Sequence, residues 1–536
     1  ALAASVAACQ GLPLPGAEAE DPSTGRPVVT TDSGSLRGRV TNGIATFLGI
    51  PYAAPPVRDL RWRPPQPTAA WNGIRAAVEF GLDCVQHTSS TLAQSEDCLY
   101  LNVWAPAGAP GQQLSVMVWI HGGGLSFDSA AVSIYDGAEL ARQGVVLVSI
   151  NYRLARFGFF AHPALTAEDP GGLLGNYGLM DQIAALLWVQ RNIAAFGGNP
   201  ADVTIFGESA GGRSVHALLG SPLAADLFHK AIIQSGSGQV QYRHIRQERP
   251  GLGPTAEAMG VDFAIEVGLE EPNAAELRSV PTPLVRGPIA DSPPEFPNAM
   301  IDGHLVREDP TETYVLGRHH HVPVIIGANA LEASLGNRQL IGDRALLENL
   351  GDATEEALVL YDGYGTGDDD LIALEMAGDL GEVHRTLGYA KLLTSAGAPV
   401  YLYHFSYVTE ARRETDPAAR HADELPYVFN TLAALANITD RDRDLARQMS
   451  SYWTQFARTG DPNGNTVPIW PAFTEDSNAL MEFAMSGQPV ARRSFESAKM
   501  AFWDALYDSG WRYPPIQEEQ EADTPASSQT PSSNPQ

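Results

Sequence analysis

The stretch VTIFGESAGG at residues 203–212 decides the fold, because it joins an apolar strand to a serine in a glycine-rich turn. The run VTIF at 203–206 has the composition of a buried strand, and GESAG at 207–211 follows it directly. This order matches G-x-S-x-G, a sharp turn that exposes a serine hydroxyl between a strand and a helix. Side chains at Gly207 or Gly211 would collide with neighbouring backbone. We therefore predict that Ser209 is a nucleophile at the start of a helix, whose N–H groups stabilise negative charge.

A second glycine-rich turn, WIHGGG at 119–124, ends an earlier apolar run. A tetrahedral intermediate needs hydrogen-bond donors aimed at its oxygen, and losing one donor costs about 3–4 kcal/mol. Glycines let backbone N–H groups approach a substrate closely. By itself HGGG would be no more than a loop. Together with the serine turn it predicts an oxyanion hole formed by the N–H groups of Gly123, Gly124 and Ala210.

Short apolar runs on both sides of these turns predict the rest of a sheet. They are VMVWI at 116–120, VVLVSI at 145–150, AIIQ at 231–234, VPVIIG at 322–327 and YLYHF at 401–405. Turns and segments with helical periodicity follow them, and residues 178–196 show that periodicity clearly. Strands that alternate with helices predict an α/β protein with a mostly parallel central sheet and helices on both faces. Active sites of such sheets form at the carboxyl ends of the strands.

The composition favours one large globular domain and argues against nucleic acid as a partner. Of the 536 residues, 44% are hydrophobic and 18% charged, an ordinary globular balance. Acidic residues outnumber basic ones by 63 to 35, and the net charge of −28 repels phosphate backbones. Residues 28–513 contain no long linker, internal repeat or transmembrane stretch. We expect one catalytic domain over that range.

The two ends of the chain differ from this domain. ALAASVAACQG at 1–11 resembles the end of a secretory signal, and VAAC at 6–9 resembles a bacterial lipoprotein cleavage box. We interpret residues 1–27 as a signal remnant and flexible tether, with a lipid anchor at Cys9. Alternatively, the signal is cut elsewhere and Cys9 is discarded or left free. Residues 514–536 have almost no core-forming side chains and are predicted to be disordered. The N-terminal segment therefore predicts that the protein is exported by a bacterium and is either periplasmic or anchored to a membrane.

The other two cysteines, Cys84 and Cys98, lie close together in the sequence. A disulfide between them would close a short loop and indicate an oxidising compartment. Two reduced, buried thiols are the alternative, and the spacing alone does not distinguish the two.

These motifs, in this order, resemble the type-B carboxylesterase/lipase family, which includes the cholinesterases and bacterial p-nitrobenzyl esterases. The resemblance extends over nearly the whole of 28–513. It includes SEDCLYLNVWAP at 95–106, VSINYRLARFGFF at 148–160, GNYGLMDQIAALLWVQRNIAAFGGNP at 175–200 and YWTQFARTGDPN at 452–463. It implies the α/β-hydrolase fold, a small-molecule ester substrate, no cofactor, no metal and no obligate protein partner. It also implies that Cys84 pairs with Cys98, because the family's first disulfide closes at the DC of SEDCLYLNV.

The resemblance supplies the rest of a catalytic triad. In VPVIIGANALEASL at 322–335 the family's acid falls at Glu332, with Leu331 and Ala333 where the family commonly has Asp and Gly. In RHADELPYVF at 420–429 the family's histidine falls at His421. The order serine, acid, histidine agrees with that of α/β-hydrolases.

The triad predicts acyl transfer in two steps. His421 takes the proton of Ser209 as the hydroxyl attacks the ester carbonyl, and Glu332 orients the imidazole. The alcohol leaves, and water that His421 activates then hydrolyses the acyl-enzyme. Ser235, in IIQSGS at 232–237, matches a family serine that supports the acid, and Glu208 is expected beside the pocket, where it tunes the field.

A run of three histidines at 319–321 could suggest a metal site, whereas Asp368, Asp369 and Asp370 are interpreted as a helix N-terminus rather than a calcium site. Neighbouring residues of an extended segment point in alternating directions, so three in succession rarely converge on one ion. We therefore predict no metal site.

Basic residues near the nucleophile suggest a substrate class. Arg213 stands four residues after Ser209, where the family usually has a small residue, and QYRHIRQER at 241–249 adds further cations. Arginine suits bidentate recognition of carboxylates, so the acyl group of the ester is expected to carry carboxylates. Bacterial fumonisin esterases, which remove tricarballylate side chains, are the family branch that fits.

Other interpretations remain open at this stage. Arg213 could face away along its helix and the 241–249 cluster could be a solvated surface, which would leave a broad-specificity neutral carboxylesterase or lipase. A non-catalytic, cholinesterase-like binding protein is the remaining alternative, although such proteins typically lack the nucleophile.

Overall fold

The computed structural model describes residues 25–511, apart from residues 89–91, 170, 239–240, 289–297, 335–342, 363–364, 366 and 433–434. The predictions about Cys9, about most of the 1–27 segment and about the 514–536 tail concern residues outside this description. No helix in the described ranges is both long and apolar enough to cross a membrane.

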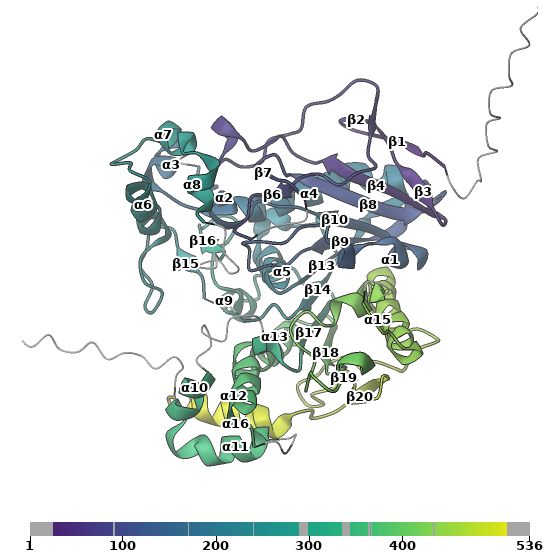
Figure 1. Cartoon of the computed structure of the whole chain (residues 1–536), viewed down its shortest axis with the longest axis vertical. Helices are drawn as coiled ribbons and strands as arrows, with labels where there is room; N and C mark the ends of the chain where they lie inside the picture. The colour runs from purple at the N-terminus through teal and green to yellow at the C-terminus, as the bar shows by residue number, and fades with distance from the viewer. Residues whose placement is uncertain are drawn as a thin grey trace, which may run out of the picture.

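A large mixed sheet runs through the molecule (Figure 1). Its described strands, in spatial order, are β20 (Pro489–Arg492), β19 (Leu480–Phe483), β18 (Val400–Phe405), β17 (Val324–Asn329), β14 (Lys230–Gln234), β13 (Gly198–Glu208), β9 (Leu114–Ile120), β10 (Val146–Ile150), β8 (Tyr100–Pro106), β4 (Ile44–Pro51) and β3 (Arg39–Thr41). The strands from β19 to β10 are parallel, and antiparallel strands flank them on both sides. All six predicted strands lie in the parallel centre, so the prediction of a mostly parallel sheet is confirmed.

Alternating side chains of the central strands belong to two hydrophobic cores, one on each face of the sheet. On β9, Val116 and Val118 belong to the core that includes residues of α4, α5 and α13. Met117 and Trp119 belong to the other core, with residues of α1, α14 and α15. Successive side chains of a strand point to opposite faces, so a strand buried on both faces reads as a continuous apolar run. Helices therefore cover both faces of the sheet, as predicted.

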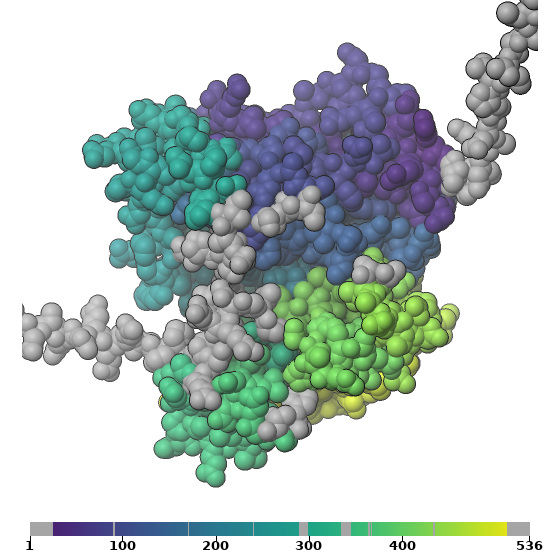
Figure 2. Space-filling view, viewed as in Figure 1, coloured from purple at the N-terminus to yellow at the C-terminus, as the bar shows by residue number. Residues whose placement is uncertain are grey.

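The described helices have the following bounds: α1 (Ala138–Arg142), α2 (Ala155–Gly158), α3 (Pro163–Glu168), α4 (Tyr177–Asn192), α5 (Ala210–Gly220), α6 (Ala256–Glu266), α7 (Ala274–Ser279), α8 (Thr282–Arg286), α9 (Pro310–Val315), α10 (Asp343–Asn349), α11 (Thr354–Tyr361), α12 (Asp369–Gly378), α13 (His384–Ser395), α14 (Leu425–Val428), α15 (Asp440–Thr459) and α16 (Ser497–Asp508). Short strands outside the large sheet are β1 (Val28–Thr31), β2 (Gly34–Arg37), β5 (Ile74–Ala76), β6 (Asp83–Cys84), β7 (Gln94–Ser95), β11 (Phe159–Phe160), β12 (Gly175–Asn176), β15 (Arg243–His244) and β16 (Met300–Ile301). A π-helical turn, Asp379–Val383, joins α12 to α13. Figure 2 shows the green and yellow C-terminal region packed directly below the blue and purple N-terminal region.

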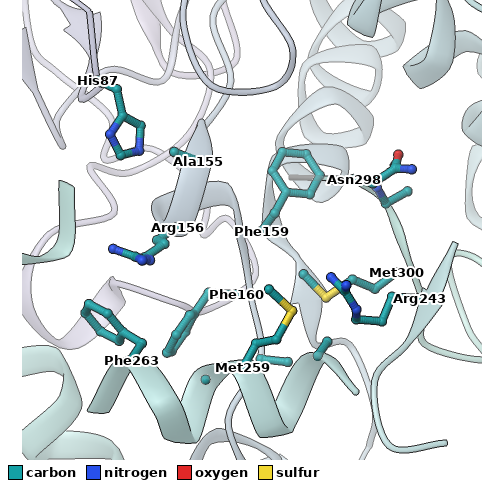
Figure 3. Close-up of a pocket in the computed structure, with 14 residues that line it drawn as sticks. His87, Ala155, Arg156, Phe159, Phe160, Arg243, Met259, Phe263, Asn298 and Met300 are labelled. Carbon is teal, nitrogen blue, oxygen red and sulfur yellow. Dashed lines mark hydrogen bonds between the residues drawn. The ribbon is translucent and has the colours of Figure 1, made fainter. Parts of the chain in front are cut away.

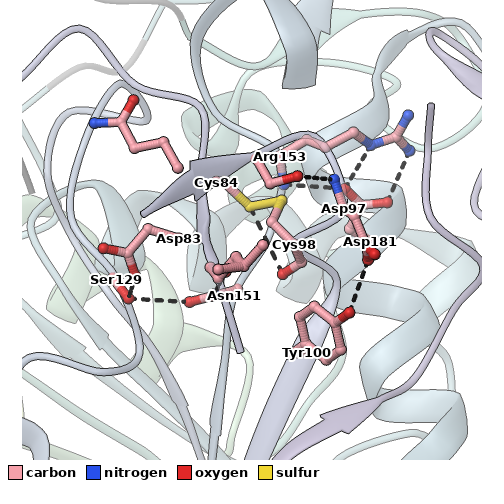
Figure 4. Close-up of a disulfide and its surroundings, with 12 residues drawn as sticks. Asp83, Cys84, Asp97, Cys98, Tyr100, Ser129, Asn151, Arg153 and Asp181 are labelled. Atoms are coloured by element: carbon pink, nitrogen blue, oxygen red, sulfur yellow. Dashed lines mark hydrogen bonds and ion pairs between the residues drawn. A yellow bond between two sulfur atoms is a disulfide. The ribbon is translucent and has the colours of Figure 1, made fainter. Parts of the chain in front are cut away.

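A disulfide links Cys84 to Cys98, as the family resemblance implied (Figure 4). Buried polar contacts lie close to the disulfide. Ser129 Oγ donates a hydrogen bond of 2.5 Å to Asp83, next to the first cysteine. Arg153 and Asp181 form a buried ion pair nearby, with N–O distances of 2.7 Å.

Removing this disulfide is expected to destabilise the fold. The two cysteines are 14 residues apart, and closing a loop of this size stabilises a protein by about 3 kcal/mol in the chain-entropy model. The double variant C84S/C98S should lose about that much free energy of unfolding, measured by urea denaturation. Dithiothreitol should shift the wild-type midpoint in the same direction and leave the variant unchanged. An unchanged wild-type midpoint under reduction would contradict the prediction.

Candidate active site

Ser209 sits at the junction of β13 and α5 with an unusual backbone conformation. Its φ of 55° and ψ of −120° lie in a region that non-glycine residues rarely adopt, at a cost of about 1–3 kcal/mol. Its N–H donates to the carbonyl of Gln234 at 2.9 Å, and its own carbonyl accepts the N–H of Arg213 at 2.9 Å. Ser209 is partly exposed, whereas Glu208 and Ala210 on either side are buried. The strained turn thus presents the serine out of the backbone, as the motif predicts.

The two glycines of the turn are required by close backbone contacts. A Cβ on Gly207 would lie 2.5 Å from the carbonyl carbon of Gly211. A Cβ on Gly211 would lie 2.0 Å from the carbonyl oxygen of Ile120, at the end of β9. Only glycine allows the turn to pack against this strand, which brings the WIHGGG loop next to the serine.

The WIHGGG loop lies directly against Ser209. A Cβ on Gly122 would be 3.2 Å from the Cβ of Ser209, and Gly123 has a φ of 80° that favours glycine. Tyr152 holds the loop in place. Its hydroxyl donates to the carbonyl of His121 at 2.8 Å, and the rings of Tyr152 and His121 stack with their centroids 4.5 Å apart. The structure therefore brings the loop that carries Gly123 and Gly124 to the serine.

Glu332 and His421, which are 89 residues apart in sequence, are in contact through Oε2 and Nδ1. The other carboxylate oxygen of Glu332 accepts a hydrogen bond of 2.6 Å from Ser235 Oγ and one of 2.5 Å from the N–H of Asn329. The side chains of Glu332 and His421 are 3% and 8% exposed. Three partners therefore hold the acid in one orientation, and one of them is the predicted Ser235.

The loops that carry this pair are joined through their backbones. Glu332 follows the end of β17, and Leu331 forms an isolated β-bridge with Arg420, the residue before His421. The backbone N–H of Leu331 donates to the carbonyl of Ala419 at 2.8 Å, and the side-chain amide of Asn329 donates to the carbonyl of Arg420 at 2.8 Å. The acid and the histidine are thus brought into register by main-chain contacts that sequence spacing does not reveal.

Glu208 reaches the opposite nitrogen of His421. Its Oε1 lies 2.9 Å from His421 Nε2, and its side chain is 4% exposed. Burial raises the pKa of Glu208, while the charge of His421 and the contact with it oppose that rise. The sequence placed Glu208 beside the pocket, and the structure brings it into direct contact with the imidazole.

The electrostatics of His421 are set by the surrounding carboxyl groups. Burial lowers the pKa of His421, but the negative charges of Glu208 and Glu332 and their hydrogen bonds raise it well above its ordinary value. Two further buried acids lie within electrostatic reach. Burial and repulsion by nearby glutamates raise the pKa of Glu382 and of Glu424 to about 8. At neutral pH these two acids are therefore mostly protonated.

We expect Glu208→Gln to shift the pH profile of kcat/KM toward lower pH. The family resemblance predicts that His421 is the general base, and such a base accepts a proton only when it is neutral, so activity should rise through its pKa as the pH increases. Removing the charge of Glu208 lowers that pKa, and the acidic limb should move down by about one pH unit or more. Glu424→Gln is the matched control, because burial raises the pKa of Glu424 to about 8, so that the substitution removes little charge at lower pH. An unshifted limb in Glu208→Gln would contradict the assignment.

Arg213 belongs to the first turn of α5 and lies within electrostatic reach of the site. Burial lowers its pKa, while Tyr242, Tyr152, Glu382 and Glu208 raise it. Arg213 therefore lies near the groups that surround the serine.

The 241–249 cluster is largely structural. Arg249 pairs with Asp309 at 2.6 Å, and the His244 ring accepts the N–H groups of Arg246 and Gln247 at 3.0 Å. Arg246 is exposed, and Arg243 Nη2 donates to the carbonyl of Leu252 at 2.9 Å. The sequence grouped these cations as a possible substrate site, but the structure disperses them.

Sequence reasoning missed three groups of this region: Tyr152 under the WIHGGG loop, and the buried Glu382 and Glu424. The only available signal for Glu424 was its position three residues after His421. Glu382 had no such signal, since it comes from the π-helical turn before α13 and accepts the N–H of Ser237 at 2.5 Å. Of the three histidines at 319–321, His320 contacts the carbonyl of Ser221 at 2.7 Å, and His319 packs on Tyr314.

Comparisons with known proteins agree with this architecture. A model of the carboxylesterase family matches residues 25–364 and 372–503. The carboxylesterase EST55 of Geobacillus stearothermophilus superposes with a TM-score of 0.76 at 36% identity, covering 89% of this chain and 99% of that one. A structure of a PNB esterase superposes with a TM-score of 0.75 at 34% identity, covering 89% and 100%. The protein therefore has the α/β-hydrolase fold, as predicted.

Proteins with similar sequences are also named esterases. The fumonisin B1 esterase of Sphingopyxis macrogoltabida is 37% identical over 498 residues, which cover 87% of each chain. The cocaine esterase of Homo sapiens is 33% identical over 557 residues, which cover 93% of this chain and 94% of the relative. The chain belongs to the carboxylesterase family and is a carboxylic ester hydrolase.

Proposed function

We propose that the protein hydrolyses esters through a triad of Ser209, His421 and Glu332, with an acyl-enzyme intermediate. The observation that carries this proposal is that His421, which contacts Glu332, also contacts Glu208, the residue before a serine in a strained turn. The WIHGGG loop against Ser209 supports an oxyanion hole formed by the N–H groups of Gly123, Gly124 and Ala210. Residues 28–513 would form the single catalytic domain.

The reaction proceeds in two steps. In the first, His421 Nε2 accepts the hydroxyl proton of Ser209 while the oxygen attacks the ester carbonyl, and the same nitrogen returns the proton to the leaving alcohol. Glu332 holds Nδ1–H and stabilises the imidazolium. In the second step, His421 takes a proton from water, which hydrolyses the acyl-enzyme. Because Glu208 contacts Nε2, the imidazole must exchange this contact for the serine and the water during turnover.

We propose esters with polycarboxylic acyl groups as substrates, such as the tricarballylate esters of fumonisin. Arg213, one helical turn after Ser209, is the cation that would bind an acyl carboxylate. The 37% identity to a fumonisin B1 esterase supports this choice. A broad-specificity neutral carboxylesterase is the second candidate, supported by the 33% identity to a cocaine esterase.

Acid release from fumonisin B1 and from a neutral butyrate ester, followed by mass spectrometry, distinguishes the two. We expect a preference for the tricarballylate ester, lost in Arg213→Met through a higher KM for that substrate alone. Arg246→Met is the matched control, because Arg246 is exposed. Turnover of the neutral ester alone would contradict the polycarboxylic substrate and support the general carboxylesterase.

We further propose that the protein is exported, as a periplasmic protein or as a lipoprotein anchored at Cys9. The Cys84–Cys98 disulfide supports export, because such bonds persist in oxidising compartments. Fractionation of a bacterial host, with mass spectrometry of the N-terminal peptide, tests both points. Wild type in the cytosolic fraction would contradict export, and an unmodified Cys9 peptide would contradict the anchor.

A further inference from the structure

A cavity of about 170 Å³ lies apart from the proposed triad, between α2, α6 and the short strands β11, β15 and β16 (Figure 3). Its described lining includes none of the residues proposed for the triad or the oxyanion hole. Most of its wall is apolar and consists of Phe159, Phe160, Met259, Phe263 and Met300. Cavities of this size hold a single small ring, since about 150 Å³ is enough for benzene.

The polar part of the lining is mostly basic. It contains His87, Arg156, Arg243 and the neutral Asn298, and no Asp or Glu is among the described residues that line the cavity. In Figure 3, His87 and Arg156 lie to the left of Phe159, and Arg243 lies to its right, beside Met300. Burial and the nearby arginines lower the pKa of His87, so the positive charge of the lining comes from its two guanidinium groups. In a chain with a net charge of −28, two guanidinium groups at one apolar cavity indicate an anionic occupant.

His87 gives an independent indication of a ligand. The residue is 6% exposed, and its Nδ1 has no hydrogen-bond partner among the described residues. A buried polar atom of this kind is normally satisfied, by protein, water or ligand. Depending on the tautomer, Nδ1 presents a lone pair or an N–H, and a carboxylic acid or its anion matches either.

Arg156 lies close to His87. A Cβ on Gly287 would be 3.7 Å from His87 Cε1 and 3.9 Å from Arg156 Nη1, so both side chains reach the same point. The Arg156 guanidinium stacks over Phe263 at 4.8 Å, and its ion-pair partner Glu266 is 3.8 Å away and 67% exposed. Water screens such an exposed pair, so a desolvated carboxylate would bind the guanidinium more strongly than Glu266 does.

We infer that this cavity is a second ligand site, which binds a small monocarboxylate with an aromatic or branched aliphatic body. The body packs on the phenylalanine and methionine side chains. The carboxylate lies between Arg156 and His87. This site is separate from the proposed ester site and does not depend on the identity of the ester.

Isothermal titration of the full chain with benzoate tests the inference, with benzyl alcohol as the neutral analogue. We expect saturable benzoate binding that depends on Arg156, with benzyl alcohol weaker by about tenfold or more, because the charge-assisted hydrogen bonds are lost. Arg156→Met should weaken benzoate by about tenfold. Met259→Trp, which fills the cavity, should abolish binding.

Arg246→Met, an exposed change in the neighbouring segment, is the control and should leave the affinity unchanged. Ester turnover and circular dichroism of each variant should match wild type, which separates loss of the site from loss of the fold. Absence of saturable benzoate binding would overturn the inference. So would equal binding of benzyl alcohol, or wild-type affinity in both Arg156→Met and Met259→Trp.

Discussion

Ser209→Ala is expected to lower kcat for ester hydrolysis by about a million-fold, the loss seen when a catalytic serine acts as one unit with its histidine. The variant removes the oxygen that forms the acyl-enzyme, so only the oxyanion donors and substrate binding remain to accelerate the reaction. Alanine fits the site sterically, although the strained φ of 55° stays. A continuous assay with a chromogenic butyrate ester measures the rate of the wild type, and a long end-point assay with the same ester measures the much lower rate of the variant.

Ser214→Ala is the matched control for this experiment. Ser214 lies on the same helix and is buried, and its hydroxyl donates to the carbonyl of Ala210 at 3.0 Å. Its loss should cost some stability and leave kcat within about tenfold of wild type. A Ser209→Ala enzyme with wild-type turnover would show that another residue is the nucleophile.

Glu332→Gln is expected to lower kcat by about 10⁴-fold with little change in KM. The amide keeps the shape of the carboxylate but removes the charge that stabilises the imidazolium. It also offers an N–H to Nδ1, which favours the tautomer with its proton on Nε2, where the proton of Ser209 must go. The rate and the pH profile with a neutral ester measure this effect.

Glu382→Gln provides the comparison, because burial and the nearby charge of Glu332 raise the pKa of Glu382 to about 8 and leave it mostly protonated at neutral pH. At pH 7 it should retain turnover within about tenfold of wild type, since the substitution removes little charge. Equal losses in Glu332→Gln and Glu382→Gln would mean that Glu332 has no special role.

The centre of the fold could be predicted from the sequence because its strands are buried on both faces. A run such as VMVWI at 116–120 needs no alternation to be recognised, since both neighbouring cores accept apolar side chains. The short outer strands β3, β19 and β20 were missed. β3 has only three residues and β19 and β20 have four each, which is too short for a reliable period-two pattern.

The candidate site likewise has parts that the sequence predicts and parts that it does not. The serine turn and the WIHGGG loop are local and carry their geometry in their glycines. Glu332 and His421 depend on contacts 89 residues apart, and only the family resemblance located them in the sequence. The protonation of Glu382 and Glu424 depends on burial, which the residue type alone does not indicate. The cations at 241–249 were grouped because they are close in the sequence, yet most of them bind other groups of the protein.

The most direct test of the central claim is covalent trapping of the nucleophile with diethyl p-nitrophenyl phosphate, followed by peptide mass spectrometry. The account predicts one diethylphosphoryl group per chain, located on Ser209, with loss of activity in proportion to labelling and no labelling of Ser209→Ala. Inactivation with the adduct on another residue, or full ester turnover by enzyme that carries the adduct on Ser209, would contradict it.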